Sequence, residues 1–97
     1  MSVNMILKLT AKPGEVDSLI KWCNESFPTT RSFDGCEELN LFKVAGEMDT
    51  LMIVEQWESE EKYAAYFSWR QENGTIKELY SRLSIPIGMT KIELLPA

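Results

Sequence analysis

The hydrophobic residues of this chain follow two different periods, and the order in which these periods occur predicts the fold. The segment from Val3 to Thr10 is mostly apolar, with Asn4, Lys8 and Thr10 on alternate positions, which indicates a strand with one buried face. After the break at Lys12-Pro13-Gly14, a segment from Glu15 to Pro28 has apolar residues spaced three and four positions apart. That spacing is typical of a helix. We expect Pro28 to end this helix, whose apolar stripe consists of Val16, Leu19, Ile20, Cys23 and Phe27.

Two more strands are predicted in the middle of the chain. The turn signal Phe33-Asp34-Gly35 precedes a loosely alternating segment from Cys36 to Val44. A short polar loop then leads to a second apolar run, Thr50 to Trp57, which is rich in β-branched residues. Because the loop is short, we expect these two strands to pair as a hairpin.

The rest of the chain predicts a broken helix and a last strand. Ser59 is a suitable N-cap for a helix that runs to about Glu72 and stops at Asn73-Gly74. Thr75 and Glu78 have the spacing of a capping box. They begin a short helix that ends before Pro86, and its apolar stripe consists of Ile76, Leu79, Tyr80 and Leu83. The final strand is expected from Gly88 to Leu95.

The predicted order β-α-β-β-α-β defines an α+β fold of the ferredoxin-like type, with a four-stranded antiparallel sheet and its helices on one face. Ninety-seven residues suffice for one core, so residues 1–97 are expected to form a single domain. The third strand has Met52 and Val54 on one side and Leu51 and Ile53 on the other. Both faces therefore suit burial, and we expect a homodimer that packs the open sheet faces together.

Composition and charge exclude several classes of partner. The net charge is -5 and the isoelectric point is about 4.7, so a phosphate-binding surface for nucleic acid is not expected. No apolar run reaches membrane-spanning length and no secretory leader is visible, which predicts a cytoplasmic protein.

Cys23 and Cys36 could form a disulfide, but the position of Cys23 on an apolar helix face favours free, buried thiols.

The sequence lacks the residues of the common catalytic and metal sites. It contains no histidine, no Cys-x-x-Cys pair, no glycine-rich phosphate loop and no nucleophile elbow. No metal site is therefore expected. Hydrolytic and nucleotide-binding chemistry is also unsupported by the sequence.

One cluster of residues could form a binding pocket. Trp57 ends the third strand, and Tyr63, Tyr66 and Phe67 share one face of the next helix. These aromatic rings could simply form the core between helix and sheet. Glu55 shares a strand face with Trp57, so a carboxylate would enter an apolar enclosure.

Such a carboxylate needs a cation or hydrogen-bond donors, or its pKa rises. It could form an ion pair or take part in proton transfer. Arg70 and Lys77 are the candidate partners of Glu55, and both readings stay open. The roles of Trp22, Phe33 and Trp69 are unassigned, because each could belong to the core, a dimer surface or the rim of a pocket.

These residues carry a resemblance to a known family. The segment QWESEEKY from Gln56 to Tyr63 resembles the antibiotic biosynthesis monooxygenases, which are dimeric α/β barrels. The motifs KPG at Lys12, DGC at Asp34 and the predicted element order agree with it. The best-known branch of that family oxidises aromatic phenols to quinones with molecular oxygen. It uses no flavin, haem or metal, so the resemblance implies that no cofactor is needed.

The resemblance also implies site residues. Trp57 and Tyr63 match a tryptophan and a tyrosine of that branch. Ile53 stands where the branch has an asparagine, and Lys77 stands where it has an arginine, so an amide donor and a planar cation are missing. A haem-degrading branch binds iron through a histidine, which this chain does not have.

Two functions are therefore expected from the sequence. In the first, the protein is a cofactor-independent monooxygenase acting on a small aromatic phenol or quinol. Trp57, Tyr63, Glu55 and Lys77 would then be catalytic, while Ile53, Tyr66, Phe67 and Arg70 would bind substrate. In the second, the same fold is a non-catalytic dimeric module that binds a small molecule. An open pocket would favour either function over a filled core.

Overall fold

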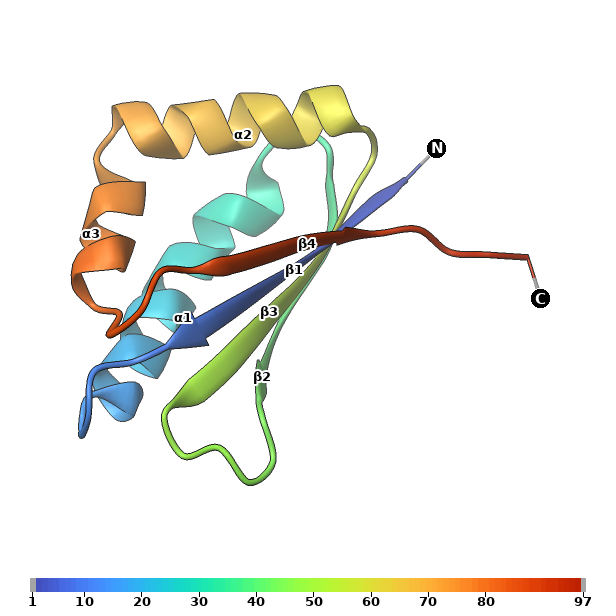
Figure 1. Cartoon of the computed structure of the whole chain (residues 1–97). Coiled ribbons are helices and arrows are strands. Elements are labelled where there is room, and N and C mark those ends of the chain that lie inside the picture. The colour runs from blue at the N-terminus through green and yellow to red at the C-terminus, as the bar shows by residue number, and fades with distance from the viewer. Residues whose placement is uncertain (1, 97) are drawn as a thin grey trace.

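A computed structural model describes residues 2–96 and confirms the predicted α+β fold. Four strands form one antiparallel sheet in the order β2-β3-β1-β4. Three helices lie together on one side of this sheet (Figure 1). In chain order the elements are β1 Val3–Thr10, α1 Val16–Ser32, β2 Cys36–Lys43, β3 Thr50–Trp57, α2 Glu60–Glu72, α3 Thr75–Ser81 and β4 Gly88–Ile92.

The core lies between the sheet and the helices. In β1 and β3 every second side chain is buried, as expected for strands that have one face covered. Val3 pairs with Trp57 and Leu7 with Ile53, so these buried positions lie side by side on the covered face. Leu19, Cys23 and Phe27 of α1 contribute to the same apolar cluster. Glu55 also points to this covered face, which is the arrangement that makes a site possible.

The predicted end of the first helix at Pro28 is wrong, because α1 continues through Pro28 to Ser32. Proline lacks the N–H that would bond the carbonyl four residues earlier, so a helix is weakened at this point. The last turn nevertheless forms around Thr30, which is buried and hydrogen-bonded to Tyr66 and Arg70 of α2. Tertiary contacts have therefore overridden the local signal.

The capping box predicted at Thr75 and Glu78 is also wrong. Gly74 is the N-cap of α3 in a left-handed conformation, with φ of 83°, and Thr75 is already the first helical residue. Asn73 Oδ1 accepts hydrogen bonds from the Thr75 backbone N–H and hydroxyl. Glu78 pairs instead with Arg82 at the other end of the helix. By contrast, Ser59 caps α2 as predicted, by accepting a bond from the Lys62 N–H.

The last strand is shorter than predicted, since β4 ends at Ile92 rather than Leu95. Ile92 pairs with Asn4, near the beginning of β1, so the residues after Ile92 soon run past the end of the partner strand. Beyond that point the chain extends away from the sheet (Figure 1). Leu94 and Leu95 are accordingly exposed. The second strand likewise ends one residue early, at Lys43.

The turn with the sequence Asp34-Gly35-Cys36 fixes the entry into β2 against the beginning of α2. Gly35 has φ of 95°, and a Cβ added there would collide with the Lys62 side chain. The Gly35 carbonyl accepts a hydrogen bond from the Glu58 N–H at 2.8 Å. Asp34 forms an ion pair with Lys62. Only glycine permits both the positive φ and this close approach of the turn to α2.

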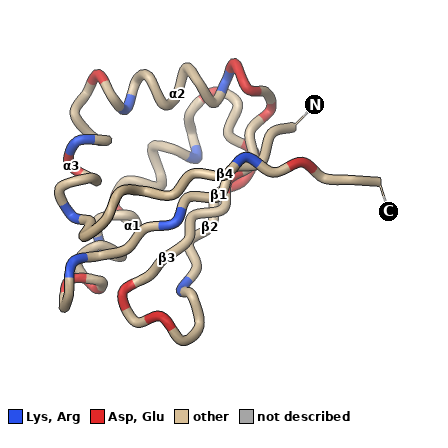
Figure 2. Tube along the Cα trace, viewed as in Figure 1, with Lys and Arg blue, Asp and Glu red and all other residues tan. Residues whose placement is uncertain are grey.

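Charged residues are concentrated away from the covered face. Acidic side chains gather in the loop between β2 and β3 and around the beginning of α2 (Figure 2). The uncovered face of the sheet carries apolar residues among polar ones, including the charged residues Lys8 and Glu38. On that face lie Ile6, Met52, Val54, Phe42 and Ile92, of which Phe42 is 51 % and Ile92 40 % exposed.

Candidate functional site

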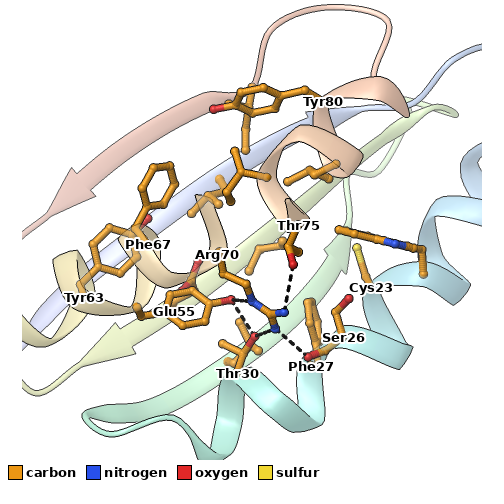
Figure 3. Close-up of a pocket in the computed structure, with 18 residues that line it drawn as sticks. Cys23, Ser26, Phe27, Thr30, Glu55, Tyr63, Phe67, Arg70, Thr75 and Tyr80 are labelled. Atoms are coloured by element: carbon orange, nitrogen blue, oxygen red, sulfur yellow. Dashed lines mark hydrogen bonds between the residues drawn. The ribbon is translucent and has the colours of Figure 1, made fainter. Parts of the chain in front are cut away.

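A small cavity lies between the sheet and the helices. Its walls come from β1, β2, β3 and all three helices, together with Ile87 just before β4. The volume is about 60 Å³, and the walls are mostly apolar. Glu55 is the only carboxylate among the lining residues and Arg70 is the only cation (Figure 3). The cavity therefore brings one carboxyl group and one permanent cation into an apolar enclosure.

Glu55 is buried in the wall formed by β3. Its side chain is 4 % exposed, and its Oε1 accepts a hydrogen bond from the Trp57 indole N–H at 2.8 Å. Strand alternation explains this contact, because residues two apart point to the same face. Burial raises the pKa of Glu55, while the bond from Trp57 lowers it. Burial is the larger effect, so Glu55 holds a proton at higher pH than a carboxyl in water.

Tyr63 lies close to Glu55 with its hydroxyl unused. The hydroxyl oxygen is fully buried and has no hydrogen-bond partner within residues 2–96. Burial, followed by the nearby Glu55 charge, raises the pKa of Tyr63. A buried hydroxyl without a partner costs free energy. It is therefore available to a water molecule or a ligand inside the cavity.

Arg70 extends from α2 towards α1 and α3 (Figure 3). It is 7 % exposed, and its Nε donates to the Tyr66 hydroxyl at 3.0 Å. Its Nη2 donates to Thr30 Oγ1 at 3.0 Å and to the Ser26 carbonyl at 3.1 Å. Its Nη1 donates to Thr75 Oγ1 at 3.5 Å, the longest of the four bonds. All four acceptors are neutral.

A group of stacked aromatic rings supports the cavity from behind. Trp57 is completely buried, and its ring lies 4.8 Å from that of Tyr66 and 5.7 Å from that of Tyr63, measured between centroids. Phe33 contacts Trp57, Tyr66 and Trp69, with centroid distances of 5.2–6.3 Å. These rings hold α2 against the sheet. Phe33 and Trp69, which the sequence left unassigned, belong to this stack.

The residues predicted for the site are mostly brought together. Glu55, Tyr63, Ile53, Tyr66, Phe67 and Arg70 all line the cavity. Trp57 does not line the cavity. Its indole N–H instead donates a hydrogen bond to Glu55, which does. Lys77 is exposed on α3 and is not among the lining residues, so its catalytic role stays a prediction.

The ion pair considered for Glu55 is absent from the described part of the chain. Within residues 2–96 no salt bridge joins Glu55 to Arg70 or Lys77. The hydrogen-bond partner of Glu55 is Trp57, and those of Arg70 are hydroxyls and a carbonyl. Two buried ionisable groups of opposite sign therefore share one cavity without pairing.

Sequence reasoning missed the contribution of α1. Trp22, Ser26 and Thr30 line the cavity, and two of them bond Arg70. Thr30 continues the stripe of Cys23 and Phe27 by one more step of three, so the signal was present in the helical period. It was hidden by the expectation that Pro28 ends the helix.

The size of the cavity limits what can enter it in this conformation. A volume of 60 Å³ has room for roughly four water molecules, whereas benzene occupies an engineered cavity of about 150 Å³. A single aromatic ring therefore requires a lining side chain to turn outward. Tyr80 is the suitable candidate, because it lines the cavity and is already 47 % exposed.

Three further observations concern the described residues. Both cysteines are free, as expected, but only Cys23 is buried, whereas Cys36 is half-buried. Burial raises the pKa of the Cys23 thiol to about 11. Residues 2–96 contain no group of three or more potential metal-ligating side chains. None of the helices among them is long and apolar enough to cross a membrane.

The fold and the cavity define a small ferredoxin-like α+β protein with a small apolar cavity between sheet and helices. A family model described as antibiotic biosynthesis monooxygenase matches residues 2–72. This match covers more than half of the chain, so the chain belongs to that family. A comparison with curated proteins finds no match.

Solved structures share the fold. Rv0793 from Mycobacterium tuberculosis aligns with a TM-score of 0.87 and 18 % identity, covering 100 % of this chain and 98 % of its own. NE2512 from Nitrosomonas europaea, a protein of unknown function, has a TM-score of 0.82 and 21 % identity, covering 99 % and 91 %. A structure described as antibiotic biosynthesis monooxygenase has a TM-score of 0.85 and 14 % identity, covering 97 % and 99 %. At these identities the likeness shows the fold alone.

Proposed function

We propose that this protein is a cofactor-independent monooxygenase that oxidises a small phenol or quinol with molecular oxygen. The observation that carries the proposal is the buried Glu55 carboxyl beside the unpartnered Tyr63 hydroxyl in an apolar cavity. Such a site can remove a proton from a phenol and hold the resulting anion away from water. The family of the chain supports oxygen chemistry of this type.

The reaction needs no bound redox group, because the substrate itself supplies the electrons. Glu55 takes the phenol proton, and the phenolate becomes electron-rich enough to transfer one electron to oxygen. The resulting superoxide and phenoxyl radical combine at a ring carbon, and loss of water from that adduct gives the quinone. In balance, a phenol with a free para position and one O₂ give a para-quinone and one H₂O.

The raised pKa of Glu55 suits this role. A general base works best when its pKa lies near the working pH, and burial moves Glu55 in that direction from the ordinary value of 4.5. Trp57 holds one carboxylate oxygen and leaves the other without a hydrogen bond among the described residues. In the proposal, that second oxygen accepts the phenol proton, and Tyr63 donates to the phenolate oxygen.

One observation favours a second candidate, a module that binds a small molecule without oxidising it. Ile53 lines the cavity where the oxidising branch has an asparagine, so an amide donor is missing from the wall. This candidate predicts ligand binding with no oxygen consumption.

Oxygen uptake with a panel of one-ring phenols and quinols tests the proposal. The wild type should consume oxygen and form a quinone that is visible in the absorption spectrum. Glu55→Gln and Tyr63→Phe should each lower kcat by roughly a hundredfold, since each removes one group acting on the transferred proton or the developing anion.

Glu25→Gln is the matched control, because Glu25 is exposed on α1 and does not line the cavity. It should leave the rate unchanged. Binding of a phenol without any oxygen uptake would contradict the proposal and favour the binding module. Full activity in both site variants would contradict the assigned roles.

We also propose that two copies associate through the uncovered sheet face. Ile6, Met52 and Val54 form an apolar strip across β1 and β3, flanked by Phe42 on β2 and Ile92 on β4. Within residues 2–96 the three helices all lie on the other side of the sheet (Figure 1). An exposed patch of this kind marks an interaction surface, and an identical patch on a second copy is complementary in polarity.

Sedimentation of the wild type and of Val54→Lys tests the association. The wild type should sediment as a dimer, and the lysine should shift it to a monomer because two buried like charges would face each other. Thr90→Lys, at the edge strand of the same face, is the control and should have a smaller effect. A wild type that sediments as a monomer at micromolar concentration would contradict the association.

A further inference from the structure

Arg70 is a buried cation without a counter-ion. Its guanidinium makes four hydrogen bonds, to the Tyr66, Thr30 and Thr75 hydroxyls and to the Ser26 carbonyl. These acceptors satisfy donors but carry no net charge. Buried charges in proteins are normally paired, because an isolated charge is costly in an apolar enclosure. No salt bridge to Arg70 occurs within residues 2–96.

The guanidinium also has a donor to spare. Arginine has five N–H groups, and the four bonds leave one Nη1 N–H without an acceptor among the described residues. The bond from Nη1 to Thr75 is itself at the 3.5 Å limit. Arg70 lines the cavity, and its Nη1 is directed at Thr75, which also lines the cavity (Figure 3).

The carboxyl group in the cavity wall does not form an ion pair with Arg70. Glu55 is the only carboxyl among the lining residues, and it bonds Trp57 instead. Burial favours its neutral form, whereas a guanidinium is permanently charged. The Arg70 guanidinium therefore has no bonded counter-ion in the described part of the cavity wall.

A purely structural role for Arg70 would use its charge only in cation–π contacts, in which Cζ lies 5.4 Å from the Tyr66 ring centroid and 5.0 Å from that of Trp69. The tie from α2 to Ser26 and Thr30 of α1 uses ordinary hydrogen-bond donors, which a neutral amide can also supply. The planar guanidinium differs from an amide in its charge and in its fit to a carboxylate. The geometry of Arg70 thus suits an anionic oxygen better than it suits a tie alone.

We propose that Arg70 is an anion-binding residue and that the cavity takes an aromatic acid, a single ring whose carboxylate accepts a hydrogen bond from Arg70 Nη1. The existing 60 Å³ is enough for the carboxylate group, and the ring occupies the space that opens when Tyr80 turns outward. This inference rests on the proposed function only for what happens to the ring after binding. In that function, a phenol bearing a carboxylate would present its hydroxyl to Glu55. The binding step itself does not depend on oxidation.

Anaerobic calorimetry with matched ligand pairs tests the inference. The three hydroxybenzoates and the corresponding neutral hydroxybenzamides have nearly the same shape but differ in charge. The wild type should bind at least one acid roughly tenfold or more tightly than its amide, and this preference should weaken at high salt. A wild type that binds every amide as well as its acid, or binds neither member of any pair, would overturn the inference.

Two variants assign the preference to Arg70. Arg70→Gln should bind acid and amide equally, while Arg31→Gln should keep the preference of the wild type. Arg31 is a suitable control because it is exposed on α1, bonds the Leu39 carbonyl and does not line the cavity. An acid preference that survives in Arg70→Gln would overturn the inference. If Arg70→Gln does not fold, Arg70→Lys keeps the charge without the planar fork and should retain part of the preference.

Oxygen uptake separates this inference from the proposed function. Tight acid binding without oxygen uptake would support the anion site and contradict the monooxygenase. Oxygen uptake with neutral phenols and no preference for acids would support the monooxygenase and contradict the anion site.

Discussion

The sheet side and the helix side of the cavity each bury one ionisable residue, and they handle the charge in opposite ways. Glu55 on β3 has one hydrogen bond, from Trp57, and burial raises its pKa so that it can be neutral. Arg70 on α2 has four hydrogen bonds to neutral acceptors and cannot lose its charge. The sheet side is therefore suited to moving a proton, and the helix side to holding an anion.

Removal of the Trp57 side chain should have the largest effect on stability. Trp57→Ala leaves a cavity in the core and takes the donor away from Glu55, so unfolding should cost about 3–5 kcal/mol less. Urea denaturation followed by circular dichroism measures this. Trp69→Ala is the control, since Trp69 is 36 % exposed, and it should lose clearly less. Equal losses of stability in Trp57→Ala and Trp69→Ala would contradict the expectation that the buried Trp57 stabilises the sheet side more than the exposed Trp69 stabilises α2.

On the helix side, Arg70→Met should lower the free energy of unfolding by about 1–3 kcal/mol. The change removes the hydrogen bonds to Tyr66, Thr30 and Ser26 but also removes a buried charge, so the two effects partly cancel. Arg31→Met, at an exposed position of α1, should change it less. A more stable Arg70→Met would show that the charge is retained for binding at the expense of stability.

The pH dependence of stability should distinguish Glu55 from other carboxyls. Because its pKa is raised in the folded state, the folded protein binds more protons than the unfolded chain between pH 4.5 and the folded pKa. Stability from this group is thus present below pH 4.5 and is lost as pH rises through the folded pKa.

Glu55→Gln removes that loss and keeps an acceptor for Trp57. The variant should be more stable than the wild type at pH 8 and similar to it at pH 4, as thermal unfolding at each pH would measure. Glu25→Gln should show no such pH-dependent difference in stability from the wild type, because Glu25 is exposed. A wild type and Glu55→Gln with parallel pH curves would contradict the raised pKa.

Tyr63→Phe should have the smallest effect on stability. The hydroxyl has no partner in the described part of the chain, so its removal should change the free energy of unfolding by less than about 1 kcal/mol, with the variant equal or slightly more stable. Tyr66→Phe is the matched comparison, because the Tyr66 hydroxyl bonds Arg70 and Thr30 and should cost more. A large loss of stability in Tyr63→Phe would mean that a water molecule in the cavity forms a hydrogen bond with the Tyr63 hydroxyl.

Local signals in the sequence predicted most of the fold. Strand alternation placed Glu55 and Trp57 on one face, and the Ser59 cap and the Gly74 stop marked the ends of α2. Local signals failed at Pro28, where contacts of Thr30 with α2 extend the helix beyond the proline. They also failed at β4, whose length depends on where its partner β1 begins.

The sequence by itself determined the order of the elements and the side chains that face the helices, because both follow from periods of two and of about 3.6 residues. Only the tertiary structure decided the partners of the two buried ionisable residues. Arg70 and Thr30 are forty positions apart, and no local pattern connects them. Strand alternation put Glu55 and Trp57 on one face, but their bond depends on packing that closes the core around both. Burial then decides the chemistry of Glu55, since the same carboxyl on the surface would stay hydrated and ionised at neutral pH.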